Sequence, residues 1–156
     1  MTITLIINGE SRNVETEVNE TLLSVLRRLG LHSVKFGCGE GTCGACVVLL
    51  DGEPVNSCCV LAARAHCRSI TTVEGLGEMS APHPLQAVFV EHGAVQCGYS
   101  TPGTILAAYA LLARNPDPTD EEIKRAIDGN LCRCTGYVKR VEAIKAAIAV
   151  MKEAGR

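Results

Sequence analysis

The stretch GCGEGTCGAC, residues 37–46, places Cys38, Cys43 and Cys46 in the pattern C-x4-C-x2-C. Its interspersed glycines allow the backbone to approach sulfur closely and to turn its amides toward it. Cys58 follows a short way along the chain, after a predicted hairpin that returns it toward this loop. The spacing is typical of plant-type 2Fe-2S sites. The stretch therefore predicts an iron–sulfur cluster held by these four thiolates.

Two other interpretations of the same stretch are weaker. A structural zinc site needs two C-x2-C pairs or a mixture of cysteine and histidine, whereas this stretch has one short pair and no histidine nearby. Residues 39–44 also match the dinucleotide-binding pattern G-x-G-x-x-G, which requires a preceding buried strand and a following helix. Here a helix precedes and apolar strand residues follow, so a cluster-binding loop explains the glycines better.

Around this loop, the N-terminal half alternates short strands with one helix. The dipeptides Asn8-Gly9 and Asp51-Gly52 are those that tight hairpin turns favour. The period changes to that of a helix over Thr21–Leu29, with Gly30 placed to end it in a left-handed conformation. A small sheet crossed by one helix is the result. The predicted strands are Thr2–Ile7, Arg12–Val18, Val47–Leu50, Val55–Ser57 and Ser69–Val73.

A linker separates this half from a helical one. The segment EGLGEMSAPHP, residues 74–84, has no hydrophobic period and contains repeated glycine and proline. We therefore expect an α+β chain with a sheet domain at residues 1–76, a linker at 77–84 and an all-α domain at 85–156. Four helices joined by short loops favour a compact antiparallel bundle in the second domain.

The helical half carries clear capping signals. Thr101 is the expected cap of the second of its helices, with Pro102 at the first helical position. Thr119 and Glu122 form a capping box at the start of the third. The predicted helices are Leu85–Glu91, Pro102–Arg114, residues 120–128 and Val138–Glu153.

A second group of cysteines lies wholly in the helical half. Cys97 belongs to the motif VQCGYSTPG, and Cys132 and Cys134 belong to GNLCRCTGY. Both motifs occupy loops between helices, so the three thiols could converge. A C-x-C pair is too close for an unstrained disulfide and is commoner among metal ligands. The spacing favours metal binding over the alternative, a set of unrelated buried cysteines.

Composition limits the class of protein. The chain has 156 residues, 47% of them hydrophobic, and a formal charge of −2 with no basic block. We expect packed domains, no nucleic-acid partner and no membrane insertion. Nine cysteines, an odd number, are typical of metal or redox chemistry in a reducing compartment, and the first ten residues lack a secretory signal, so we expect the cytoplasm. Cys59 and Cys67 fit neither group and are most simply a small core residue and a free thiol.

Together these motifs resemble a known family, the small iron–sulfur subunit of molybdenum hydroxylases of the xanthine oxidase family. That family includes carbon monoxide dehydrogenase and many aldehyde and heteroaromatic hydroxylases. The resemblance covers nearly the whole chain and rests on GCGEGTCGAC with Cys58, TVEGL before the linker, VQCGYSTPG and GNLCRCTGY. It implies a ferredoxin-like β-grasp domain followed by a four-helix domain, each holding one 2Fe-2S cluster.

The resemblance also assigns roles to residues. It implies that Cys38, Cys43, Cys46 and Cys58 hold the N-terminal cluster, which faces FAD on a medium subunit. The C-terminal cluster lies beside the molybdopterin of a large subunit. Positions matching Gln96 and Cys134 lie against the pterin in the family, so electrons would run from molybdenum through both clusters to FAD, in a dimer of heterotrimers. The implied protein ligands of the C-terminal cluster are Cys97, Cys132 and Cys134, with the position of Ser100 as the fourth.

Ser100 departs from the family motif, Q-C-G-[YF]-C-x-P-G, in which this position is cysteine. The C-terminal cluster therefore has three of its four expected thiolates. Ser100 could ligate iron as an alkoxide, a harder donor that lowers the reduction potential. Alternatively, the cluster is degraded or replaced by another species, or the serine is an engineered or strain-specific change that leaves a labile site.

The leading hypothesis is an electron-transfer subunit within a larger molybdenum-dependent oxidoreductase. The chain is too short to hold a molybdopterin domain, and its four histidines are scattered singly, so it offers no catalytic acid or base. One alternative is an independent soluble ferredoxin, although the cysteine-bearing helical half argues against a free carrier. The other is a zinc-stapled adaptor with no redox role.

Overall fold

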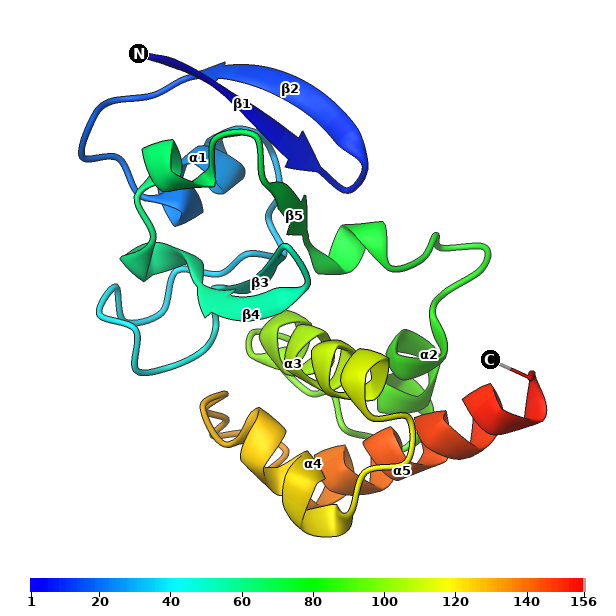
Figure 1. Ribbon diagram of the computed structural model, residues 1–156. Coiled ribbons are helices and arrows are strands. Elements are labelled where there is room, and N and C mark those ends of the chain that lie inside the picture. The colour runs from blue at the N-terminus through cyan, green and yellow to red at the C-terminus, as the bar shows by residue number, and fades with distance from the viewer. Residues whose placement is uncertain (156) are drawn as a thin grey trace.

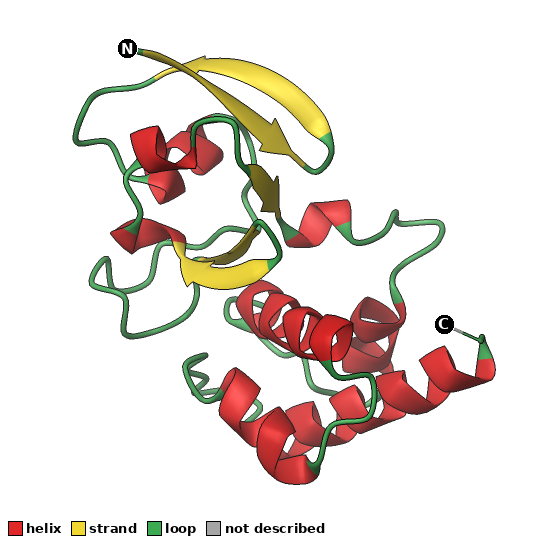
Figure 2. Ribbon diagram, in the orientation of Figure 1, coloured by secondary structure: helices red, strands yellow, loops and turns green. Residues whose placement is uncertain are grey.

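The computed structural model describes residues 1–155 as a five-stranded mixed sheet followed by a group of helices (Figures 1 and 2). The strand order is β2-β1-β5-β3-β4, with β1 and β5 parallel and the other neighbours antiparallel. The chain is therefore an α+β protein, as its pattern predicts. The strands are β1 (Thr2–Ile7), β2 (Glu10–Glu15), β3 (Val47–Leu50), β4 (Glu53–Asn56) and β5 (Ser69–Thr71).

Both predicted hairpins form at the predicted turns. Asn8 and Gly9 have φ of 51° and 86°, and Asp51 and Gly52 have φ of 52° and 84°, the left-handed values that a type I′ turn requires. The strand ends differ from the sequence expectation. The strand predicted to end at Val18 ends at Glu15, and the last predicted strand ends two residues early because the chain turns into a 3-10 helix at Val73–Gly75.

Helix α1 (Leu22–Arg28) packs its apolar side on one face of the sheet. The Thr21 hydroxyl accepts from the Ser24 amide at 3.2 Å, and Gly30 follows the helix with φ of 88°. Leu22 and Leu26 are fully buried in a core shared with β1, β3 and β5. Two short 3-10 helices, Ser57–Cys59 and Ala62–Ala65, lie between β4 and β5, so Ser57 belongs to a helical turn rather than to the predicted strand.

The second half contains four α-helices, as predicted. They are α2 (Pro84–Glu91), α3 (Thr101–Arg114), α4 (Asp120–Ile127) and α5 (Val138–Glu153). Thr119 and Glu122 form the expected capping box of α4. The cap of α3 is Ser100, so the prediction of Thr101 is wrong by one residue. His83 and Gln86 make a capping box for α2 that the sequence pattern did not indicate.

Helix α3 joins the two halves. In Figure 1 it lies directly beneath β3 and β4, with α2, α4 and α5 on its other sides. Leu49 of β3 points away from the N-terminal core and is buried against Leu106 and Ala110 of α3. The opposite side of α3 contributes Ile105 and Ala108 to the core of the helical half. The loops that carry the cysteines meet at the start of this helix.

Candidate metal centres

The first cysteine group lies on the loop before β3 and on the 3-10 helix after β4. Within the group, the side chain of Cys38 interacts with that of Cys43, and the side chain of Cys46 with that of Cys58. Cys58 Sγ also lies 3.7 Å from Cys59 Sγ, outside the group. The amide of Glu40 donates to Cys38 Sγ at 3.5 Å. This bond and the hydroxyl of Thr42 lower the pKa of the Cys38 thiol to about 5. The loop thus favours the thiolate, which is the form that binds metal.

The inner pair of this group is shielded from solvent. Burial raises the pKa of the thiols of Cys46 and Cys58, whose residues are 2% and 9% exposed. Space around the loop depends on glycine: a Cβ at Gly37 would lie 2.7 Å from Cys43 Sγ. A cysteine-rich loop in which glycine leaves room beside a sulfur fits a sulfide-bridged cluster.

The second group lies on the loops before α3 and α5, as its sequence predicts. Its members also form pairs: Cys97 is hydrogen-bonded to Cys134, and Cys132 to Ser100. The Tyr99 amide donates to Cys97 Sγ at 3.5 Å and lowers the pKa of that thiol. The interaction of the Cys134 side chain with Cys97 raises the pKa of the Cys134 thiol. These side chains line a cavity of about 240 Å³.

Cys132 shows how strongly this loop favours a thiolate. Burial opposes ionisation, but hydrogen bonds from Thr135, Ser100 and the backbone outweigh it and lower the pKa of Cys132 to about 6. The second group offers three thiols and one hydroxyl to the cavity, a donor set that fits an iron–sulfur cluster with one oxygen position. Cys43 of the first group also lines the cavity wall. Among residues 1–155, no three cysteine, histidine or acidic side chains gather around one point as they would around a single ion.

Ser100 is 6% exposed and occupies the N-cap of α3, yet its hydroxyl makes no cap hydrogen bond. Instead its Oγ accepts from Arg140 Nη2 at 2.5 Å and contacts the Cys132 thiol. Arg140, in the first turn of α5, is 1% exposed. Its other contacts belong to Thr104, whose Oγ1 accepts from Nη1 at 2.8 Å.

The two cysteine groups meet through backbone contacts. The amide of Leu131, the residue before Cys132, donates to the Cys43 carbonyl at 2.9 Å. Asn130 Nδ2 donates to the Gly44 carbonyl at 3.0 Å in a fully buried contact. A Cβ at Gly103 would lie 2.3 Å from that same carbonyl, so this helix can approach the loop only without a side chain there.

The remaining residues of interest lie at the edge of these groups or outside them. Gln96 is exposed beside the second group, and Cys134, the partner of Cys97, is also exposed. The expectation that Cys59 is a core residue is wrong: Cys59 is exposed because the 3-10 turn directs Cys58 inward and leaves its neighbour outside, with 3.7 Å between their sulfurs. Cys67 is exposed, as expected of a free thiol, and its Sγ lies 3.3 Å from His66 Nε2.

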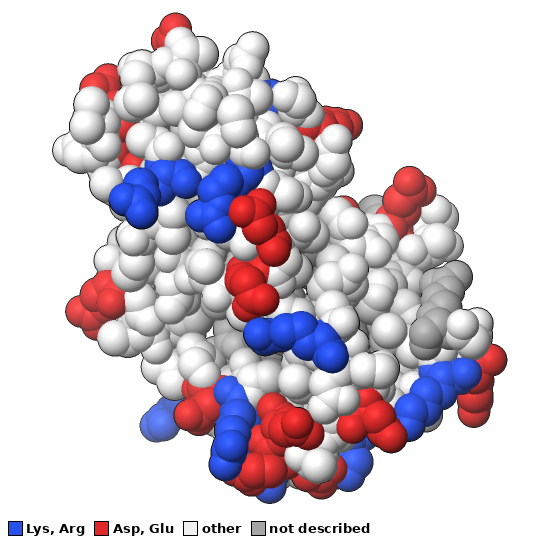
Figure 3. All heavy atoms as spheres, in the orientation of Figure 1, with Lys and Arg blue, Asp and Glu red and all other residues white. Residues whose placement is uncertain are grey.

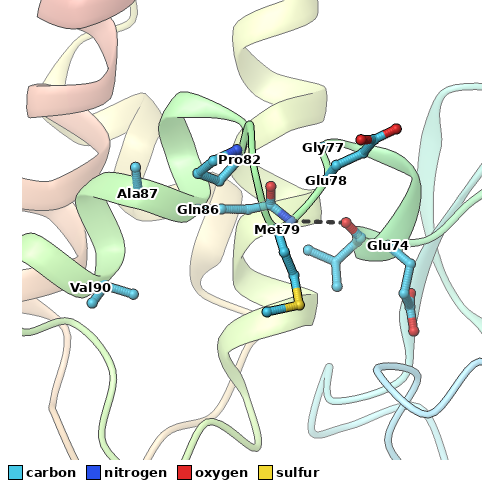
Figure 4. A pocket seen from close by; sticks show the side chains of 9 residues that line it. Glu74, Gly77, Glu78, Met79, Pro82, Gln86, Ala87 and Val90 are labelled. Atoms are coloured by element: carbon cyan, nitrogen blue, oxygen red, sulfur yellow. Dashed lines mark hydrogen bonds between the residues drawn. The ribbon is translucent and has the colours of Figure 1, made fainter.

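Other surfaces of the molecule are less specialised. A groove of about 550 Å³ follows the linker, where Gln86 Nε2 donates to the Val73 carbonyl at 3.0 Å (Figure 4). On the face shown in Figure 3, basic and acidic side chains are interspersed rather than gathered in a basic stripe. None of the helices in residues 1–155 has the length and apolar character needed to span a bilayer.

Comparison with known proteins agrees with this division of cysteines. The family of 2Fe-2S iron–sulfur cluster binding domains matches residues 5–68, and a further 2Fe-2S binding domain family matches residues 72–145. The paired thiols and these two matches define the class: an iron–sulfur protein with two 2Fe-2S sites.

Individual relatives give the family. The nicotinate dehydrogenase small FeS subunit of Eubacterium barkeri is 56% identical over 149 residues, which are 95% of either chain. Quinoline 2-oxidoreductase from Pseudomonas putida 86 superposes with a TM-score of 0.92 and 41% identity over 98% of this chain and 96% of that one. The aldehyde oxidoreductase of Desulfovibrio desulfuricans ATCC 27774 gives a TM-score of 0.94 and 46% identity over 97% of this chain, which spans 17% of that longer chain. The chain belongs to the family of small iron–sulfur subunits of the molybdenum hydroxylases of the xanthine oxidase family.

Proposed function

We propose that the side chains of the two cysteine groups hold two 2Fe-2S clusters, and that the two side chains of each interacting pair bind the same iron. A binuclear cluster takes two protein ligands on each iron, and each member of the two groups interacts with one other member of its own group. This pairing is the observation that carries the proposal. The N-terminal cluster is held by Cys38, Cys43, Cys46 and Cys58, and the C-terminal cluster by Cys97, Ser100, Cys132 and Cys134.

Ser100 fills the fourth position of the second cluster in this proposal. Its Oγ is buried, contacts the thiol of Cys132 and lines the same cavity as Cys97 and Cys134. As a ligand, Ser100 Oγ would hold iron in its alkoxide form, after loss of the hydroxyl proton. Iron makes this deprotonation favourable in the way that metals deprotonate other ligands.

The clusters supply one-electron transfer, and the chain is the electron-transfer subunit of a molybdenum-dependent oxidoreductase. Its own residues hold the two sites close together and connect them. From Cys43, a path of one hydrogen bond and the Leu131 backbone leads to Cys132. The direction we propose runs from a molybdenum site through the helical half and then the sheet half to FAD.

The assembly around the chain is part of the same proposal. The sheet half is a β-grasp domain at residues 1–76 and the helical half a four-helix bundle at 85–156, joined by the linker at 77–84. Exposed Gln96 and Cys134 face the molybdopterin of a large subunit, and a medium subunit carries FAD, in a cytoplasmic dimer of heterotrimers. Large apolar side chains left exposed beside the cysteine loops support burial against partners: Phe36, Tyr99, Leu131 and Tyr137.

Paired substitutions in the assembled enzyme test the ligand assignment. Cys43→Ser and Cys132→Ser are each expected to remove or alter one cluster signal in electron paramagnetic resonance of the reduced protein and to leave the other. Iron and acid-labile sulfide per chain give the cluster count. Cys67→Ala is the matched control, because its thiol is exposed and belongs to neither group. Loss of the same single signal in both ligand variants would show that the partition into two clusters is wrong.

An independent ferredoxin is the competing function. It predicts that the chain carries its clusters without partners and exchanges electrons as a monomer. Purification of the tagged chain from its native cell, followed by measurement of the molecular mass of the complex, distinguishes the two functions. A subunit co-purifies with larger chains that contain molybdenum and flavin. A monomer with full iron content would overturn the subunit proposal.

A further inference from the structure

Arg140 is the least expected side chain of the helical core. It is 1% exposed, and its Nε has no hydrogen-bond partner. Its two terminal nitrogens donate to Ser100 Oγ and Thr104 Oγ1, which are neutral groups. A guanidinium stays charged in proteins, so the helical core contains a buried cation.

No acidic side chain balances this charge. The ion pairs among residues 1–155 all lie elsewhere, and Arg140 takes part in none of them. The ring centroid of Tyr137, the N-cap residue of α5, lies 5.9 Å from the guanidinium carbon. An uncompensated buried charge is strongly unfavourable, so the site requires an anion.

The positions of two helices strengthen that requirement. Arg140 lies in the first turn of α5, and Ser100, which it contacts, caps the first turn of α3. Both helix starts carry partial positive charge, which disfavours a cation there. The second cysteine group lies at this place, because Ser100, which Arg140 contacts, lines the same cavity as Cys97, Cys132 and Cys134.

The same contacts fix the serine. Arg140 Nη2 holds Oγ, and Thr104 Oγ1 donates to the Ser100 carbonyl at 2.9 Å while accepting from Arg140 Nη1. The guanidinium therefore holds the side chain of Ser100 directly and its backbone carbonyl through Thr104. This network explains why the hydroxyl does not cap α3.

We propose that Arg140 is a positioning residue for the second cluster: it holds Ser100 Oγ at the fourth ligand position, and its uncompensated charge raises the reduction potential of that cluster. The inference rests on the proposed ligand set. Reduction adds one electron and one negative charge, and a buried cation stabilises the reduced state more than the oxidised one. The arginine thereby offsets the decrease in potential that an oxygen ligand causes.

Two variants of Arg140 in the assembled enzyme test this role. Arg140→Met removes the charge and keeps the length, and Arg140→Lys keeps the charge. Redox titration followed by electron paramagnetic resonance measures both clusters in one sample, so the first cluster is an internal control. Arg125→Met, at an exposed position on α4, controls for removal of a distant charge.

For Arg140→Met we expect the ratio of reduced to oxidised second cluster at a fixed potential to fall at least tenfold, which is a shift of 59 mV for a one-electron couple. In Arg140→Lys and Arg125→Met the ratio should stay within threefold of the wild type, and the first cluster should not change in any variant. An unchanged second cluster in Arg140→Met, or an equal shift of both clusters, overturns the proposal.

If Arg140→Met loses the second cluster, its potential cannot be measured, and the Arg140→Lys variant then tests the proposal. Retention of the cluster with a near-wild-type ratio in Arg140→Lys supports a requirement for charge. Loss in both variants overturns the proposal, because shape rather than charge would then explain the residue. Failure of the underlying assignment is distinguishable, since the wild-type protein would then lack the second signal.

Discussion

At Ser100 a hydroxyl in the usual position for capping a helix lies instead between a guanidinium and a thiol. The cap hydrogen bond that α3 lacks is typically worth about 1 kcal/mol. The start of α3 thus loses some helix stability, and the side chain is held where it can complete a metal site. The contacts of the Ser100 hydroxyl with Arg140 and Cys132, rather than the capping of α3, determine the conformation of this side chain.

Replacement of this serine by the cysteine of the family motif tests its contribution. We expect Ser100→Cys to raise the ratio of reduced to oxidised second cluster about tenfold or more at a fixed potential, because a thiolate is a softer donor than an alkoxide. Redox titration of the assembled enzyme measures the change. Ser80→Cys, in the exposed linker, should leave both clusters as they are, and an unchanged second cluster in Ser100→Cys would show that residue 100 does not bind iron.

Residues differ in how far the sequence reveals them. The cysteine ligands could be predicted because metal chemistry requires their spacing within a single loop. Arg140 could not, since the segment VKRVEAIK reads as a charged outer face of a helix and its burial depends on tertiary contacts with α3. The position of Cys59 was predicted wrongly because unpaired cysteines are usually buried, whereas here a 3-10 turn leaves its side chain exposed.

Among the elements, α4 is stabilised mainly at its ends. The hydroxyl of Thr119 accepts from the Glu122 amide at 3.3 Å, and the Glu122 carboxylate accepts from the Thr119 amide at 2.7 Å. Two of its eight residues, Ile123 and Ile127, are buried. A helix this short is only marginal without its cap and its contacts with neighbouring helices.

Thr119→Ala should therefore lower the free energy of unfolding by about 1 kcal/mol. Urea unfolding followed by the helical circular dichroism signal measures the loss, and Ser11→Ala on the exposed face of β2 is a control expected to change it by less than about 0.5 kcal/mol. Equal effects of the two substitutions would mean that the capping box contributes nothing particular to α4.

The cysteine loops contrast with the helices and strands because they have almost no regular structure of their own. Residues 31–46 and 128–137 contain no helix or strand. We expect removal of iron by a chelator to increase amide hydrogen exchange in these two segments at least tenfold, while the amides of β1 and β5 keep their protection. Mass spectrometry of peptides reports both regions, and uniform loss of protection would show instead that the clusters stabilise the entire fold.

Elements were predicted well where local signals decide them. Asn8-Gly9, Asp51-Gly52 and the Thr119 capping box act over a few residues, so their consequences are visible in sequence. Strand ends were predicted less well. Strand β2 ends opposite Thr2, where β1 begins, and β5 ends where the chain turns toward the 3-10 helix at Val73–Gly75. The packing of α3 on β3 joins residues more than fifty positions apart and has no local signature.

On the scale of the whole molecule, the junction between the halves depends on close backbone approach. A methyl group at Gly103 would lie 2.3 Å from the Gly44 carbonyl and 3.1 Å from Asn130 Nδ2. The same methyl group at Gly129 would meet nothing within 4 Å. Space therefore requires glycine at position 103 but not at position 129.

Gly103→Ala should separate the cluster loops and lower the free energy of unfolding by about 1–3 kcal/mol. It should also weaken the magnetic interaction between the two reduced clusters, which electron paramagnetic resonance detects as a loss of signal splitting at low temperature. Gly129→Ala is the matched control and should leave both quantities unchanged. If the alanine at position 103 has no more effect than the control, the halves are not held by this contact.

Helix α3 also has a consequence for synthesis on the ribosome. The outward side chain of Leu49 is buried against Leu106 and Ala110, which are translated long after the sheet. The nascent sheet therefore emerges with apolar surface exposed, a state in which newly made chains are prone to aggregate. We expect the first half to depend on chaperones until α3 leaves the exit tunnel. Insertion of the clusters would then begin only after the second half of the chain has been synthesised.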